Sequence, residues 1–178
     1  MRRVVVTGIG TINSTGHNVK DSFEAVVNGV CGIDTITLFD ASEFSVKIAG
    51  EVKDFDPTTV MDKKEVKKAD RFIQLGIKAA LEAMIDSGYV SQEDKKVDAS
   101  IADRFGMISG SGIGGLSTIE RNSVVCETKG SRKVSPFFIP SSLANMLSGF
   151  ISIEHNLRGP SLSHVTACAA STHALNDA

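Results

Sequence analysis

The residue best placed to do chemistry is Cys168. A largely apolar run, residues 162–167, comes before it, and a stretch of small residues, 169–175, which can begin a helix, comes after it. Where a strand turns into a helix, unpaired backbone N–H groups and the positive end of the helix dipole meet, and they stabilise a thiolate or an oxyanion. The pattern predicts a nucleophilic cysteine. A buried cysteine that packs as a small apolar side chain is the alternative.

The histidines do not supply a base for this cysteine. His164 lies four residues back along the predicted strand, and His173 lies five residues on, around the predicted helix from Cys168. Neither spacing suits a Cys–His pair. His17 and His155 fall in loop-like or helix-end contexts, where surface or capping roles are expected. The sequence therefore offers a nucleophile without its acid–base partner.

Composition places the chain among soluble α/β domains. Its 178 residues are 42% hydrophobic and 22% charged, and its net charge of −2 gives no general attraction for nucleic acid. The three cysteines are widely spaced and follow no zinc-binding pattern, which predicts reduced thiols in the cytoplasm and no metal. The first apolar run is too short for a signal peptide, and none approaches the roughly 20 residues that cross a membrane.

Strand-like and helix-like segments alternate along the chain. We expect a central buried strand at 3–7 and, after it, a helix at 21–27 and a hairpin arm at 46–52. Next come a long helix at 63–87 ended by Gly88, a polar loop at 91–103, a strand at 104–109, a helix at 116–128, a helix from Pro140 or Ser141 to 153, and a last strand before Cys168. This order is typical of a right-handed parallel α/β sheet.

The predicted long helix has two unusual faces. One is an apolar stripe of mostly small residues, in which Gly76, Ala79, Ala80 and Ala83 lower the surface and would let another backbone approach closely. The other gathers Lys64, Lys67, Lys68 and Arg71. Such a basic face is either ordinary solvated surface or a docking patch for an acidic partner.

Gly110, Gly112 and Gly115 match the spacing of a dinucleotide-binding loop between a strand and a helix. The acidic residue that such a site needs about 20 positions later is missing. Close packing of the backbone against protein or ligand is the better interpretation. A nucleotide-binding domain remains a minor alternative.

Five ordered segments, residues 4–10, 110–116, 135–141, 157–161 and 166–170, together resemble the β-ketoacyl-acyl-carrier-protein synthases of the type II elongating class. The resemblance implies a thiolase-like fold, of which this chain would hold the first βαβαβ half with a mixed, mostly parallel sheet. It also implies a decarboxylative Claisen condensation: the cysteine takes an acyl group from its carrier protein, and the carbanion from decarboxylated malonyl-carrier attacks that thioester.

The resemblance also assigns roles to particular residues. Cys168 would be the nucleophile, Ile113 would line the acyl-chain pocket, and Phe138 would reach the partner subunit's pocket across a homodimer. Lys64, Lys67 and Lys68 would bind the acidic acyl carrier protein. No cofactor, nucleic acid or membrane is implied.

The chain departs from the family pattern at its end. The family's two histidines, its lysine and the phenylalanine that completes the oxyanion hole lie after the nucleophile helix, and residues 1–178 stop within that helix. We expect an N-terminal synthase domain without its C-terminal half, inactive in condensation by itself and with exposed sheet edges and helix faces. A non-catalytic subunit or scaffold is the alternative, although the presence of Cys168 speaks against it.

Overall fold

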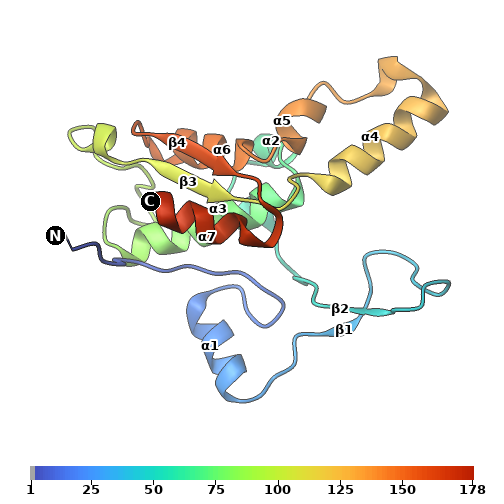
Figure 1. Ribbon diagram of the computed structural model, residues 1–178, viewed down its shortest axis with the longest axis horizontal. Helices are drawn as coiled ribbons and strands as arrows, with labels where there is room; N and C mark the ends of the chain where they lie inside the picture. The colour runs from blue at the N-terminus through green and yellow to red at the C-terminus, as the bar shows by residue number, and fades with distance from the viewer. Residues whose placement is uncertain (1–2) are drawn as a thin grey trace. The chain divides into compact units, whose positions relative to one another are not determined.

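A computed structural model describes residues 3–178 and confirms the α/β class (Figure 1). Two compact units are formed, one by the residues up to Asp56 together with Lys78–Gly88, the other by Pro57–Ile77 and Tyr89–Ala178. No helix among residues 3–178 has the length and apolar composition needed to cross a membrane. The helices and strands are α1 (Val19–Val27), β1 (Asp34–Thr35), β2 (Ile48–Ala49), α2 (Lys63–Val66), α3 (Arg71–Asp86), β3 (Met107–Gly110), α4 (Leu116–Lys129), α5 (Phe138–Ser142), α6 (Met146–His155), β4 (Ser161–His164) and α7 (Ala170–Asp177).

The second unit is built on the parallel pair β3 and β4, whose register runs from Met107 opposite Ser161 to Gly110 opposite His164. Successive residues of a strand face opposite sides of the sheet. On one side, the Ser148 hydroxyl of α6 lies 2.7 Å from the Ser109 hydroxyl. On the other side, a Cβ at Gly110 would lie 2.5 Å from the Ala170 carbonyl of α7. The pair is therefore covered by α6 on one face and by α7 on the other (Figure 1).

The end of α6 is anchored by a buried histidine. The His155 side chain is fully buried, and its Nδ1 lies 2.6 Å from the Lys95 carbonyl oxygen. Asn156 follows in the left-handed conformation, with φ of 57°, and its side-chain amide donates to the Val97 carbonyl at 3.1 Å. The expected surface or capping role of His155 is wrong, because this ring holds the polar loop against the helix.

The predicted central strand at residues 3–7 does not form. Val4 and Val6 are 89% and 77% exposed, and the run pairs with no strand among the described residues. Just after it, the Ile9 N–H donates to the Asp86 carboxylate of α3 at 3.0 Å, and the Thr11 N–H donates to Glu82 at 3.1 Å. Side-chain carboxylates thus accept hydrogen bonds from backbone N–H groups that would otherwise bond to the carbonyls of a neighbouring strand. A run of residues with high strand propensity forms no strand unless another strand pairs with it.

The small face of α3 does receive another backbone, as predicted. Within the first unit, a Cβ at Gly8 would overlap the Ala83 carbonyl, and one at Gly10 would overlap the Ala79 carbonyl. Only glycine fits at these two positions, because the segment runs directly against the helix backbone.

The helix predicted at 63–87 is two helices, because Asp70 begins a new one. Its Oδ1 accepts the Phe72 N–H at 3.3 Å, which caps α3. The carbonyls left open behind α2 find side-chain donors: the Ser141 hydroxyl bonds to the Lys68 carbonyl at 2.7 Å, and Gln74 donates to the Ala69 carbonyl at 2.9 Å. The predicted end is confirmed, since Gly88 has φ of 78°.

The helix predicted from Pro140 to residue 153 is also interrupted, between α5 and α6. Leu143 is extended, with φ of −72° and ψ of 130°, and the Ser142 carbonyl accepts the Gly115 N–H at 2.9 Å. Pro140 is the third residue of α5 and not the first of a helix. By contrast, α1, α4, β3 and the hairpin arm at β2 lie within or close to their predicted ranges.

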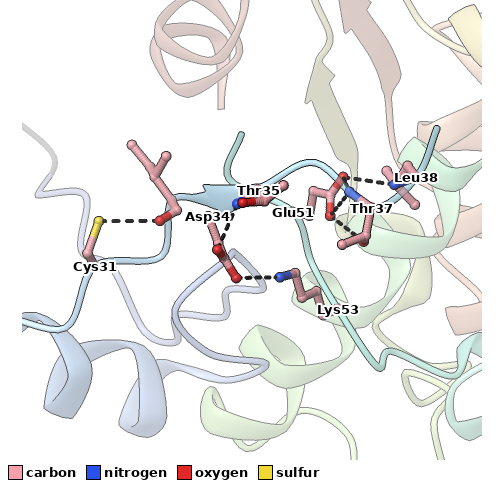
Figure 2. A network of polar contacts seen from close by, with 8 residues as sticks. Cys31, Asp34, Thr35, Thr37, Leu38, Glu51 and Lys53 are labelled. Atoms are coloured by element: carbon pink, nitrogen blue, oxygen red, sulfur yellow. Dashed lines mark hydrogen bonds and ion pairs between the residues drawn. The ribbon is translucent and has the colours of Figure 1, made fainter. Parts of the chain in front are cut away.

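The first unit carries the antiparallel pair of β1 and β2, fastened by two carboxylates (Figure 2). Lys53 Nζ lies 2.9 Å from Asp34, and this hydrogen bond lowers the pKa of the Asp34 carboxyl and raises the pKa of Lys53. Glu51 accepts from the Thr37 hydroxyl at 2.7 Å and from the Thr37 N–H at 3.0 Å, which lowers the pKa of Glu51.

Candidate active site

Cys168 lies between β4 and α7, as the sequence predicts. It is the middle residue of the 3-10 turn Ala167–Ala169, one residue before the cap of α7 and not inside that helix. Its side chain is exposed and free, so the buried alternative is wrong. We call residues 165–169 the Cys168 elbow.

The backbone of this elbow is strained. Ala167 has φ of 50°, in the left-handed region that costs an L-residue with a Cβ about 1–2 kcal/mol. The Ala169 N–H bonds back to the Thr166 carbonyl at 3.1 Å, and the Ala170 N–H bonds to the Ala167 carbonyl. Among residues 3–178 the Cys168 N–H has no acceptor. A free donor therefore sits on the same residue as the thiol, where an oxyanion formed on a bound acyl carbon could use it.

The glycine-rich segment after β3 runs beside the elbow. The Ser111 N–H bonds to the His164 carbonyl at 3.0 Å, which continues the β3–β4 pairing past the strand end. A Cβ at Gly112 would lie 3.9 Å from the Ala167 Cα, in ordinary contact. At Gly110, as described above, no Cβ would fit against α7. The glycines thus let β3 and its loop lie against the backbone that presents the sulfur.

The same packing argues against a nucleotide at this loop. The Thr118 N–H at the start of α4, which a phosphate would need, already donates to the buried Asp70 carboxylate at 2.9 Å. Cβ atoms at Gly114 and Gly115 would lie 2.6 Å from the carbonyls of Ser142 and Ser141. The packing therefore opposes the nucleotide-binding alternative, because the Thr118 N–H and the space at Gly114 and Gly115 are taken by the protein itself.

Both histidines near Cys168 have other partners. His173 Nδ1 lies 2.8 Å from the Thr166 hydroxyl. His164 Nε2 lies 2.9 Å from the Asp177 carboxylate, although not in hydrogen-bond orientation. Among residues 3–178 neither makes a hydrogen bond to the Cys168 sulfur. The link between Thr166 and His173 was missed, because seven positions separate the two residues across an irregular turn.

The other predicted site residues are placed differently. Ile113 is 63% exposed within the glycine-rich segment. Phe138 begins α5 and is half-buried. The roles of both residues stay predictions.

The basic residues do not share one helix face, because α2 ends at Val66. Lys64 lies in α2 and Lys67 lies at its C-terminal cap, and both are exposed. Lys68 is half-buried. Its Nζ lies 2.6 Å from Glu65 and 5.6 Å from the centroid of the Phe137 ring. Lys68 is therefore tied to the protein, whereas Lys64 and Lys67 are open to a partner.

A polar hollow of about 470 Å³ lies in the first unit. Its lining includes Asp34, Glu51 and Lys53, which bond to one another or to neighbouring residues as Figure 2 shows. Each of these three charged side chains therefore already has a hydrogen-bond partner within the described residues.

The family model described as "Beta-ketoacyl synthase, N-terminal domain" matches residues 1–178. The chain is 44% identical over 177 residues to a 3-oxoacyl-[acyl-carrier-protein] synthase 2 of Coxiella burnetii and 46% identical to that of Vibrio harveyi. These alignments cover 99% of this chain and 41% of each relative. The chain therefore spans about two fifths of the length of the curated relatives it matches.

Solved structures show the same fold. A type II polyketide synthase complex of an acyl-carrier protein with its ketosynthase, bound to the hexaketide, matches with a TM-score of 0.79 at 23% identity, over 100% of this chain and 46% of that chain. The likeness supports the thiolase-like fold predicted from the sequence motifs.

Proposed function

This chain belongs to the β-ketoacyl synthase family, and from that premise we propose that it carries the acyl-accepting part of a 3-oxoacyl-acyl-carrier-protein synthase, an acyltransferase of fatty-acid elongation. The observation that carries the proposal is the Cys168 elbow, where an exposed thiol and an unused N–H lie on one residue between β4 and α7.

The first half of the reaction needs the groups found there. The Cys168 thiolate attacks the carbonyl carbon of an acyl group held as a thioester on its carrier protein. A tetrahedral oxyanion forms, the carrier thiolate leaves and takes up a proton, and the acyl group remains on the sulfur. The Cys168 N–H, which has no acceptor within residues 3–178, would stabilise that oxyanion. In the second half, the carbanion from decarboxylated malonyl-carrier attacks the new thioester and releases Cys168.

The condensation half needs acid–base groups that residues 3–178 do not place at the sulfur, since His173 meets the Thr166 hydroxyl and His164 lies beside the Asp177 carboxylate. We therefore propose that these residues alone load an acyl group but do not condense it. The free cysteines agree with a reducing, cytoplasmic setting.

The partner proposed is an acyl carrier protein, as the names of the relatives suggest for them. Lys64 and Lys67 would make its main electrostatic contacts, and Lys68 would contribute less because Glu65 already holds it. Ile113 would line the path of the acyl chain, and Phe138 would face a second copy of the chain in a homodimer.

Mass-spectrometric mapping of the acyl group tests the proposal. The protein expressed from its complete open reading frame is incubated with acyl-carrier protein thioester, and the modified cysteine is identified. We expect the acyl group on Cys168, with no adduct in Cys168→Ser and full labelling in Cys31→Ser and Cys126→Ser. Equal labelling of the three cysteines would refute a specially activated Cys168.

The carrier site is tested separately. The double variant of Lys64→Glu and Lys67→Glu reverses both charges. It should raise the KM for carrier-bound acyl groups and leave the rate with a small soluble thioester unchanged. An unchanged KM for the carrier-bound substrate would remove these lysines from the docking surface.

A further inference from the structure

The hydrogen bond between Thr166 and His173 spans the Cys168 elbow. Thr166 is the last residue before the left-handed Ala167, and His173 is the fourth residue of α7. Their side chains meet at 2.8 Å between Thr166 Oγ1 and His173 Nδ1. The contact therefore joins the strand side of the elbow to the helix side, with Cys168 between them.

Thr166 is held on two sides. Its carbonyl accepts the Ala169 N–H at 3.1 Å, and its hydroxyl meets the histidine ring. A residue in a sparsely populated backbone conformation persists only when its surroundings determine it from several directions. Without the side-chain link, Ala167 can relax toward an ordinary conformation and turn Cys168 with it.

We propose that His173 is a positioning residue, which acts through the Thr166 hydroxyl to keep the Cys168 elbow in its strained, reactive shape. The inference rests on the proposed function of Cys168 as nucleophile. His173 takes no proton from the sulfur in this role, since its ring nitrogen nearest the elbow is occupied by the hydroxyl. The link also survives loss of the imidazole, provided that a polar atom remains at the Nδ1 position.

Replacing His173 by asparagine or by glutamine tests whether a polar atom at the Nδ1 position is what matters. The asparagine amide reaches about as far from the backbone as Nδ1, whereas the glutamine amide reaches the position of Nε2. The rate constant for alkylation of Cys168 by iodoacetamide is measured by peptide mapping in the protein expressed from its complete open reading frame. We expect His173→Ala and His173→Gln to slow alkylation roughly three- to tenfold, the loss that matches one hydrogen bond, and His173→Asn to restore it.

Thr166 supplies the matched control. Thr166→Ser keeps the hydroxyl and should alkylate at the original rate, while the isosteric Thr166→Val should be slowed as much as His173→Ala. The double variant of Thr166→Val and His173→Ala should be no slower than either single variant, because both remove one contact. The pH dependence of alkylation should keep its shape in His173→Asn.

Three results would overturn the proposal: unchanged alkylation in His173→Ala, equal rates for the asparagine and glutamine variants, or additive effects in the double variant. Unfolding in urea shows whether a His173 variant has lost its fold. If it has, the alkylation rates of Thr166→Val and Thr166→Ser decide whether the hydroxyl positions the elbow. The proposed function fails independently: if Cys168 takes no acyl group from the carrier but the alkylation pattern holds, the positioning role stands and the enzymatic assignment falls.

Discussion

Asp70 joins two helix starts with one buried carboxylate, and its removal should be costly. Oδ1 accepts the Phe72 N–H in the first turn of α3 at 3.3 Å, and Oδ2 accepts the Thr118 N–H in the first turn of α4 at 2.9 Å. Only 8% of the residue is exposed, so water cannot readily replace it. Loss of one capping side chain costs about 0.5–2 kcal/mol, and two caps therefore predict about 1–4 kcal/mol for Asp70→Ala.

Asp62→Ala is the matched control, because Asp62 caps the four-residue helix α2 from an exposed position, with its Oδ1 2.7 Å from the Lys64 N–H. It should cost less than about 1 kcal/mol. Asp70→Asn, which keeps one accepting oxygen, should fall between the two. The free energy of unfolding in urea measures all three, and amide hydrogen exchange should quicken at both Phe72 and Thr118. A cost for Asp70→Ala no greater than that for Asp62→Ala would refute the double cap.

Three further outcomes follow from the packing and charges. Gly110→Ala should destabilise the protein by about 1–3 kcal/mol in urea unfolding, because its Cβ would meet α7 at 2.5 Å, while Gly112→Ala, with its nearest neighbour at 3.9 Å, should cost little. Ser148→Ala should cost about 1–3 kcal/mol by the same measurement, since it removes the buried donor to the Leu162 carbonyl at 2.8 Å. The lowered pKa of Asp34 means that its pairing with Lys53 stabilises the hairpin above the carboxyl's unfolded pKa of about 3.9 and is lost as the pH falls through the lower folded value. The Thr35 amide chemical shift should follow that loss in acid and should not do so in Asp34→Asn.

Elements whose ends are encoded locally could be predicted from the sequence. Helix α1 has its cap beside it, since Asn18 accepts the Asp21 N–H at 2.8 Å, and α3 ends at a glycine with positive φ. The breaks at residues 67–70 and 143–145 could not be predicted in this way. They depend on groups far along the chain, such as the Ser141 hydroxyl at the Lys68 carbonyl and the Gly115 N–H at the Ser142 carbonyl. Hydrophobic periodicity continues across both breaks and so predicts unbroken helices.

The candidate site divides in the same way. The position of Cys168 between a strand and a helix could be predicted, because the apolar run and the small residues are contiguous with it. The left-handed Ala167 and the link from Thr166 to His173 could not be predicted, since an alanine gives no signal for positive φ. The ion pair of Lys68 with Glu65, by contrast, was readable from the sequence, because a spacing of three residues brings two side chains together on a helix.

The sulfur of Cys168 contributes nothing to the structure that holds it. Backbone contacts and the link from Thr166 to His173 fix the elbow, whereas the Cys168 side chain is exposed and makes no hydrogen bond among residues 3–178. Packing of the Cys168 side chain therefore does not offset the backbone strain at Ala167. A strained backbone next to an exposed thiol with a free N–H agrees with the proposed acyl-accepting role of Cys168. It also follows that Cys168→Ser tests the chemistry without disturbing the elbow, so that its loss of acylation can be attributed to the missing thiolate.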